Sequence, residues 1–199
     1  MTKIEYAPIA SAKLEAGASF HRTERAFDLI RLDDPAVTVV TDFKKVSALT
    51  IAEKAPIEAA NARMKHRGVR LLLVVNDDDT VVGLITSTDL LGAKPIQHIQ
   101  KHGGAYRDIL VQDIMTPQDK LEVICMDDIN RSRVGNVVAT LKQTGRAHAL
   151  VVDRHESGNR QVIRGIISAS QIARQLGIEI PAGEIAKTFA EIGTLLAGA

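Results

Sequence analysis

Residues 83–89 read GLITSTD, and they follow the apolar run LLLVV at residues 71–75. A second copy of this arrangement comes later in the chain, where GIISASQ at residues 165–171 follows ALVV at residues 149–152. A glycine also precedes each apolar run by a few residues. Self-similarity at a fixed spacing indicates repeated structural units, so the chain is predicted to contain an internal repeat.

Equivalent positions in the two copies show where their lengths differ. Gly68 corresponds to Gly145 at an offset of 77 residues. Gly83 corresponds to Gly165 at an offset of 82 residues, so the second copy is longer in the turn at residues 154–160. Surface turns tolerate insertions and buried strands do not. The pattern therefore predicts a structural duplication whose two copies pack together.

Each copy is expected to have the order β-α-β-β-α. In the first copy the expected elements are a strand at 48–51, a helix at 56–66, strands at 71–75 and 81–85, and a helix from 86 to 91. The run at 71–75 is apolar at every position, as in a strand that is buried on both faces. The helix at 56–66 has an apolar side at helical spacing and should end at Gly68.

The second copy follows the same plan after a connecting segment. A helix is expected at residues 95–101, and residues 113–117, DIMTP, lead into the second copy. Its first strand is predicted at 121–125. Its first helix has an apolar side formed by Val134, Val137, Val138 and Leu141 and should end at Gly145.

These elements give a division of the chain into five parts. They are an N-terminal strap at 1–35, a first repeat at 36–93, a connecting segment at 94–111, a second repeat at 112–178 and a C-terminal helical tail at 179–199. Within the strap, residues 23–32 favour a short helix. Residues 37–40 are predicted to form a strand leading into the first repeat. The tail carries an apolar stripe at helical spacing that should cover a core or, less simply, a dimer contact.

Composition limits the classes of function. The chain has 199 residues with 25 basic and 24 acidic side chains, so no bulk field attracts nucleic acid or an anionic membrane. No stretch approaches the ~20 apolar residues of a membrane span, and no secretory leader is expected. The single cysteine, Cys125, cannot form an internal disulfide. We therefore expect a cytoplasmic protein with no membrane partner.

The repeated motifs resemble a known family over most of residues 36–178. Residues 83–89 fit the family pattern of glycine, two apolar residues, threonine or serine, any two residues and aspartate. With the preceding helix, apolar strand and turn, and the second copy in the same order, the chain resembles a tandem cystathionine-β-synthase (CBS) domain pair, or Bateman module. Two departures from the pattern are leucine, Leu73 and Leu150, where proline is usual, and Gln171 in place of the second aspartate.

The resemblance implies an α/β (α+β) fold in which the two repeats pack with pseudo-twofold symmetry. It also implies dimerisation of the pair, clefts between repeats that bind adenosine-containing ligands, and regulation instead of catalysis. The expected ligands are AMP, ADP, ATP, NAD or S-adenosylmethionine. None is expected to be required as a cofactor, and the expected partners are a second copy of the chain and an unidentified protein target.

The candidate ligand-binding residues of the first repeat are Thr86, Ser87, Thr88, Asp89 and Arg70. The Asp89 carboxylate can accept hydrogen bonds from both hydroxyls of a ribose, and Thr86 lies at a helix start whose free N–H groups favour phosphate. The guanidinium of Arg70 would match the phosphate oxygens. An equally open interpretation is a helix N-cap, in which Thr86 and Asp89 satisfy backbone groups without a ligand.

The candidate residues of the second repeat are His148, Ser168 and Gln171. Here the helix cap is the favoured interpretation, because serine followed three residues later by glutamine fits a capping box. His148 would add charge for a phosphate only when protonated, and a half-buried, locally bonded imidazole is the simpler expectation. The first cleft should therefore be the competent one.

Other chemistry has weak support. His98 and His102 would lie one helical turn apart, but no acid or thiol lies close in sequence to complete a metal site. The chain has no Gly-x-Ser-x-Gly elbow and no glycine-rich phosphate loop, and only 3% of its residues are aromatic. We therefore expect a regulatory adenosyl-sensing protein that is not an enzyme. The alternative is a structural or interaction protein that uses the same fold without a nucleotide.

Overall fold

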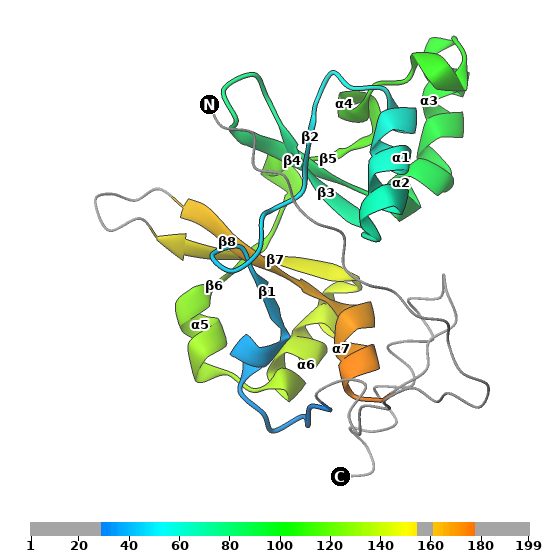
Figure 1. Ribbon diagram of the computed structural model, residues 1–199. Coiled ribbons are helices and arrows are strands. Elements are labelled where there is room, and N and C mark those ends of the chain that lie inside the picture. Colours follow the sequence, from blue (N-terminus) through cyan, green and yellow to red (C-terminus); the bar gives the residue numbers. More distant parts are fainter. Residues whose placement is uncertain (1–28, 155–160, 178–199) are drawn as a thin grey trace, which may run out of the picture.

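The computed structural model describes residues 29–154 and 161–177, which form two lobes that each contain a four-stranded sheet with helices (Figure 1). The first sheet has the order β2-β3-β4-β5, with β2 at Thr50–Ala52, β3 at Leu71–Val75, β4 at Val81–Thr86 and β5 at Thr116–Pro117. The helices of this lobe are α1 (Ile57–Arg67), α2 (Ser87–Leu91), α3 (Lys94–His102) and α4 (Val111–Ile114).

The second sheet has the order β1-β8-β7-β6, with β1 at Val40–Asp42, β6 at Val123–Cys125, β7 at His148–Arg154 and β8 at Gln161–Ser168. Its helices are α5 (Met126–Arg131), α6 (Val134–Thr144) and α7 (Ala169–Gln175). Three short 3-10 helices lie at Ala36–Val39 (η1), Tyr106–Asp108 (η2) and Gln118–Lys120 (η3).

The predicted β-α-β-β-α order is confirmed in the first repeat as β2-α1-β3-β4-α2. The second repeat has the same order with one helix more, α5, between β6 and α6. Both hairpins also shift their pairing at the same place, between Val74 and Val75 and between Val151 and Val152. These pairs are 77 residues apart, so the duplication extends to an irregularity in the strands.

Two strands cross between the lobes. The strand expected at 37–40 is instead a 3-10 helix followed by β1, and β1 pairs antiparallel with β8 in the sheet of the second repeat. In return, β5, which follows the connecting segment, pairs antiparallel with β4 in the sheet of the first repeat. Each sheet is therefore completed by a strand from the segment that leads into the other repeat.

The crossing strands explain the glycine that opens each motif. A Cβ atom added to Gly83 would lie 2.6 Å from the backbone oxygen of Thr116 on β5. A Cβ added to Gly165 would lie 2.6 Å from the backbone oxygen of Thr41 on β1. Real Cβ atoms do not approach an oxygen this closely, so glycine at these two positions allows the edge strand to pair with the hairpin.

The helix ends predicted at Gly68 and Gly145 are confirmed. These glycines follow α1 and α6 with φ angles of 65° and 64°, in the left-handed region that ends many helices. The N–H of each bonds back to a carbonyl in the last turn of its helix. Because the two glycines have the same conformation, the chain leaves α1 and α6 in the same way before it enters β3 and β7.

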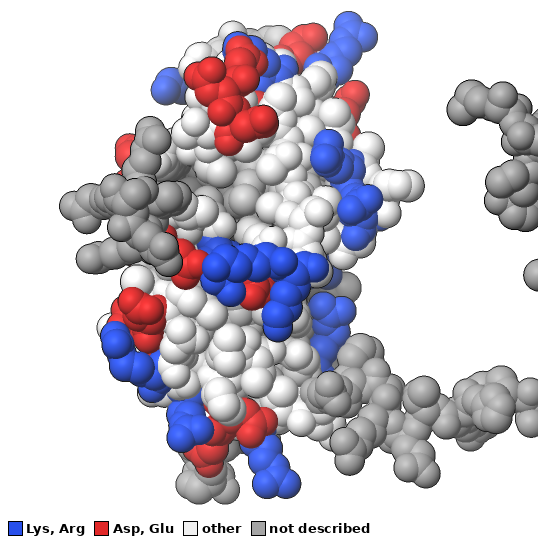
Figure 2. Space-filling view, turned by 60° about the vertical axis from the view of Figure 1, so that its left-hand side comes forward, with Lys and Arg blue, Asp and Glu red and all other residues white. Residues whose placement is uncertain are grey.

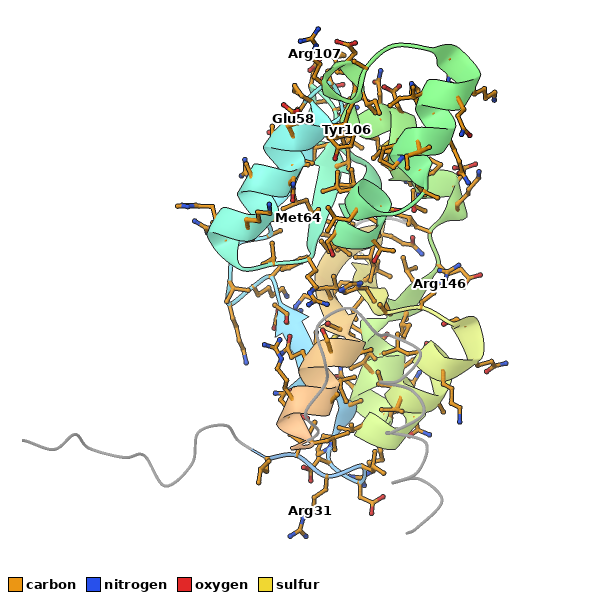
Figure 3. The ribbon with its side chains drawn as sticks, turned by 90° about the vertical axis from the view of Figure 1, so that its right-hand side faces the viewer. Arg31, Glu58, Met64, Tyr106, Arg107 and Arg146 are labelled. Atoms are coloured by element: carbon orange, nitrogen blue, oxygen red, sulfur yellow. The ribbon has the colours of Figure 1, made fainter. Side chains whose placement is uncertain are left out.

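Each lobe has its own apolar core between the sheet and its helices. In the first, α1 contributes Ile57, Ala60 and Met64, which pack with Leu72, Val74 and Ile85 of the sheet. In the second, the apolar side of α6 packs with Val151 and Ile167. Figure 3 shows Met64 on α1 in the first lobe. The expected apolar faces of both helices are therefore buried as predicted.

The opposite faces of the central strands are also buried. Leu73 and Leu150 are each 3% exposed, yet they belong to neither helix-packed core. Because side chains alternate across a strand, they point away from the helices. The strands of both lobes lie toward the middle of the molecule in Figure 1. These leucines, which replace the proline usual in the family pattern, therefore face the junction of the two lobes.

An ion-pair network fixes β1 on the second sheet. Arg164 of β8 donates to Asp42 of β1 through Nε at 2.7 Å and Nη2 at 2.9 Å, and to Asp153 of β7 through Nη1 at 2.8 Å. The hydrogen bonds from Arg164 and from the Lys44 backbone hold the pKa of Asp42 well below its usual range. The paired carboxylate therefore keeps its charge, and three strands are joined by one guanidinium.

Charges of both signs are distributed over the face shown in Figure 2, with a short basic band across its middle. Within residues 29–154 and 161–177, none of the helices has the length and apolar character that a membrane span requires. Most of the helix predicted at 23–32 and all of the tail at 179–199 lie outside the described residues. Residues 29–32 are not helical.

Candidate functional site

The helix start of the first repeat is a complete capping box. Strand β4 ends at Thr86, and α2 begins at the next residue. The backbone N–H of Asp89 donates to Thr86 Oγ1 at 3.2 Å, and the backbone N–H of Thr86 donates to Asp89 Oδ2 at 2.8 Å. The Thr86 hydroxyl also donates to Asp89 Oδ2 at 2.7 Å. Ser87 is half-buried, and Thr88 is exposed on the same turn.

The second carboxylate oxygen of Asp89 is held by a lysine that the sequence patterns did not identify. Lys94 Nζ at the start of α3 lies 2.6 Å from Asp89 Oδ1 and donates to the backbone oxygen of Ile114 at 3.0 Å. The side chain of Asp89 is only 12% exposed. Both oxygens of this carboxylate are therefore engaged within the protein. Lys94 lies beyond the motif, and no spacing in the sequence links it to Asp89.

The capping box expected in the second repeat does not form, so this prediction is wrong. Ser168 makes no side-chain cap to α7, and its hydroxyl instead lies 3.0 Å from that of Ser170. Gln171 Oε1 accepts a hydrogen bond from Thr41 Oγ1 at 3.2 Å. Because Thr41 is on β1, the crossing strand draws this glutamine away from its own helix start.

Strand pairing places the basic candidates beside the two helix starts. In the first repeat the backbone oxygen of Arg70 accepts the N–H of Ser87 at 2.9 Å, and the Arg70 side chain is exposed. In the second repeat His148 pairs directly with Ser168. Arg70 therefore lies beside the first motif and His148 beside the second.

The electrostatics of His148 show that the two strand starts are near each other. Burial and, as the lesser cause, the positive charge of Arg70 together lower the pKa of His148 to about 4. Arg70 belongs to the first repeat, so its charge acts across the junction of the lobes. At neutral pH the imidazole of His148 is uncharged and cannot supply a cation for phosphate, although it can still donate or accept hydrogen bonds.

The remaining basic, histidine and cysteine side chains have other surroundings. Arg146, a further basic residue before β7, has its Nη2 atom 3.2 Å from Glu122 Oε2 and lies where the lobes meet (Figure 3). The imidazole rings of His98 and His102 stack on α3 with centroids 4.5 Å apart. In the described residues, no three His, Cys, Asp or Glu side chains gather as a metal site. Cys125 is half-buried at the end of β6.

Comparison with known proteins agrees with this architecture. The family model for the CBS domain matches residues 35–95. A conserved protein from Pyrococcus horikoshii has 24% identity and a TM-score of 0.53, covering 77% of this chain and 100% of that chain. No curated protein gives a match to the sequence.

Two further solved structures share the fold. CBSX2 from Arabidopsis thaliana, solved in complex with AMP, has 21% identity and a TM-score of 0.50, covering 71% of this chain and 94% of that chain. The CBS domain of a bacterial CNNM/CorC family Mg²⁺ transporter has 18% identity and a TM-score of 0.51, covering 75% of this chain and 79% of that chain.

The match to the family model and the arrangement of the two lobes identify the class of protein. Residues 35–95 match the model of the CBS domain, and the fold of the two lobes is that of a CBS-pair protein. The resemblance inferred from the two motifs is thereby confirmed. At this level of identity the solved structures establish the fold, and the ligand and role of this chain are taken up as proposals.

Proposed function

We propose that the chain is a regulatory module that senses an adenine nucleotide or a related adenosyl compound at the junction of its repeats. The observation that carries the proposal is the position of Arg70. The backbone oxygen of Arg70 accepts the N–H of Ser87 at the Thr86–Asp89 helix start, its side chain is exposed, and its charge acts on His148 of the other repeat. Residues from both repeats thus border one small region, as a site whose ligand reports on their packing requires.

The chemistry of these groups fits a nucleotide. Arg70 can pair with phosphate oxygens, and the neutral imidazole of His148 can hydrogen-bond a base or a ribose. Asp89 is placed to accept the hydroxyls of a ribose if the ligand displaces Lys94 from Oδ1. Ser87 and Thr88 add polar groups at the same helix start, whereas Ser168 and Gln171 are engaged within the second repeat. The AMP complex of CBSX2, which has the same fold, supports this class of ligand.

The proposed output is a change in how the repeats pack. A ligand shifts the equilibrium between two arrangements only by its difference in affinity for them. A ligand that contacts both repeats has such a difference in affinity, because it can contact Arg70 and His148 together only in one arrangement of the repeats. We further propose a cytoplasmic homodimer that passes this change to a protein target.

The test is a thermal melt of the full chain with AMP, ADP, ATP, NAD and S-adenosylmethionine in turn. A ligand at a hundredfold excess over its dissociation constant stabilises the folded state by ~2.7 kcal/mol, which raises the melting temperature. The shift should be reduced strongly in Arg70→Gln and Asp89→Asn. Asp108→Asn is the matched control, because Asp108 Oδ2 accepts the backbone N–H of Ala105 at 2.9 Å in a similar way.

The outcomes separate the proposal from its site. If none of the five compounds raises the melting temperature, the sensor function is wrong. If one does and Arg70→Gln and Asp89→Asn respond as fully as Asp108→Asn, the function stands and the assigned residues are wrong.

One observation favours a second function: both carboxylate oxygens of Asp89 are bonded within the protein. Their partners are Thr86 and Lys94, so the motif is already satisfied as a helix cap. In this alternative the chain is a structural or interaction protein that acts through dimerisation or partner contacts. It predicts that Asp89→Asn destabilises the protein equally with and without every compound in the panel.

A further inference from the structure

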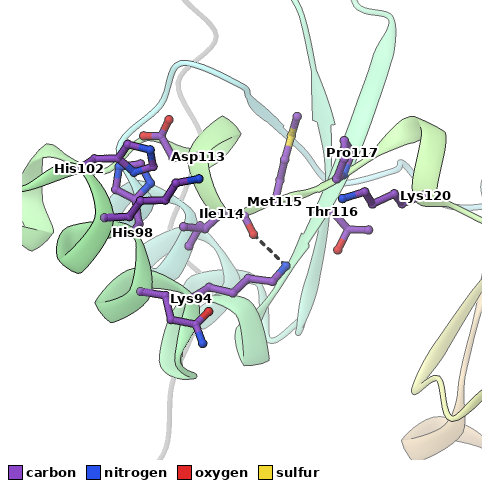
Figure 4. A pocket seen from close by; sticks show the side chains of 11 residues that line it. Lys94, His98, His102, Asp113, Ile114, Met115, Thr116, Pro117 and Lys120 are labelled. Atoms are coloured by element: carbon purple, nitrogen blue, oxygen red, sulfur yellow. Dashed lines mark hydrogen bonds between the residues drawn. The ribbon is translucent and has the colours of Figure 1, made fainter.

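A groove of about 500 Å³ lies at the edge of the first sheet, apart from the repeat junction (Figure 4). Helix α3 forms one wall, and the other is formed by the end of α4, by β5 and by η3. Its volume lies within the range of ordinary small-molecule sites. None of the candidate ligand-binding residues of the two repeats lines it, although it includes His98, His102 and the lead-in segment at residues 113–117.

Basic side chains dominate this groove. They are Lys94, His98, Lys101 and His102 on α3 and Lys120 on η3. The single acidic residue in the lining is Asp113, whose Oδ2 atom already accepts the backbone N–H of Leu110 at 2.8 Å. Low-dielectric walls lined by one sign of charge concentrate its potential, so the groove attracts anions.

The charges stand on opposite walls. Figure 4 shows Lys94, His98 and His102 on the α3 side and Lys120 beyond Thr116 and Pro117 on the other. Lys94 is largely neutralised, because its ammonium lies 2.6 Å from Asp89 Oδ1. Among the ion pairs of the described residues, neither Lys101 nor Lys120 takes part. These two lysines are therefore the cations of the groove that no ion pair of the described residues engages, and with Asp113 as the single acidic residue of the lining the balance of charge is positive.

We propose that this groove binds a small polyphosphate anion, with Lys101 and Lys120 as the two cationic contacts. Lysine binds phosphate as a point charge, and a chain of phosphates offers a negative group to a cation on each wall. Ile114, Met115 and Pro117 add apolar side chains to the lining between the two walls. The chemistry is shared by inorganic triphosphate and by the phosphate tail of a nucleotide. The groove adjoins the proposed adenosyl site through Lys94, but its two proposed cationic contacts, Lys101 and Lys120, are not part of that site.

The experiment measures binding of inorganic triphosphate and of ATP to the full chain by calorimetry at low ionic strength. Lys101→Gln combined with Lys120→Gln should weaken triphosphate binding about tenfold, because exposed charge contacts each contribute up to ~1 kcal/mol. Lys142→Gln, in the last turn of α6 in the second lobe, is the matched control and should leave binding unchanged. Added salt should weaken binding in the native chain, because exposed charges are screened.

The results distinguish the sources of the phosphate. If triphosphate and ATP bind equally well and the double variant binds neither, the groove recognises the phosphate chain. Binding of ATP alone with the same loss assigns the groove to a nucleotide tail, which also supports the proposal. The proposal is overturned if neither binds, if the double variant binds as the Lys142→Gln control does, or if only an acidic peptide, tested as polyglutamate, competes for the groove. Because Arg70→Gln leaves the groove intact, failure here is distinguishable from failure of the adenosyl site.

Discussion

The two helix starts of the molecule have equivalent sequences but different contacts. At the first, Thr86 and Asp89 bond each other and Asp89 also holds Lys94. At the second, Ser168 leaves its helix uncapped, and Gln171 bonds Thr41 on the crossing strand. The pair with the better capping sequence is therefore the one without the cap.

The difference shows how a long-range strand can override a local motif. Thr41 lies 130 residues before Gln171 and meets it only because β1 pairs with β8. In the first repeat the equivalent crossing strand, β5, leaves Asp89 to its own helix. A glutamine that bonds elsewhere cannot satisfy the backbone N–H at the start of α7. The first helix start therefore keeps a closed capping box, whereas at the second Gln171 ties α7 to the crossing strand β1.

The largest expected change in stability comes from the feature that both lobes share, a glycine that contacts the crossing strand. Gly83→Ala and Gly165→Ala should each lower the free energy of unfolding by about 2–3 kcal/mol, because each new Cβ meets a backbone oxygen at 2.6 Å and forces a strand to shift. Gly135→Ala on α6 is the control, since its Cβ would lie 3.5 Å from the nearest atom. Urea unfolding measures all three. Equal stability of the Gly165 and Gly135 variants would contradict the crossing of β1.

The next expected effect is a loss of stability at low pH that arises in the second lobe only. His148 in the second repeat corresponds to Leu71 in the first, and its pKa of about 4 lies below that of an unfolded histidine, ~6.5. The unfolded chain therefore binds more protons between these values, and stability is complete above pH ~6.5 and falls as the pH drops toward 4. The loss should approach about 3 kcal/mol.

His148→Leu, which copies the first repeat, should reduce this loss when urea midpoints are compared between pH 7 and pH 4.5. Arg70→Gln should reduce it by a smaller amount, because the guanidinium is the lesser cause of the shift. An NMR titration of His148 that gives an ordinary histidine pKa would refute the burial of this side chain at the junction.

The smallest effect compares the caps directly. Thr86→Ala removes a capping bond and should lower stability by about 1 kcal/mol. Ser168→Ala removes no cap and should change stability by less than about 0.5 kcal/mol. Thermal unfolding of both variants is sufficient. A larger loss for Ser168→Ala than for Thr86→Ala would show that the second helix start is capped after all.

Much of the fold could be predicted from the sequence, because it depends on local pattern. Helical spacing placed the buried faces of α1 and α6, and Gly68 and Gly145 marked their ends. The unbroken apolar run at β3 correctly indicated burial on both faces. Less of the candidate site could be predicted, since Lys94 and Thr41 reach the motifs only through tertiary contacts, and the ligand roles of the motif residues stay a prediction.

The sequence by itself determined a duplicated β-α-β-β-α unit and the two motifs at residues 83–89 and 165–171. Periodicity, turns and glycines act over a few residues, so they can be recognised along the chain. Only the tertiary structure decided that β1 and β5 cross between lobes and that Asp89 caps its helix while Gln171 does not. It also placed Arg70 beside His148 and lined a groove with lysines. These outcomes depend on residues that are distant in sequence, and the pairing of sheets brings them together.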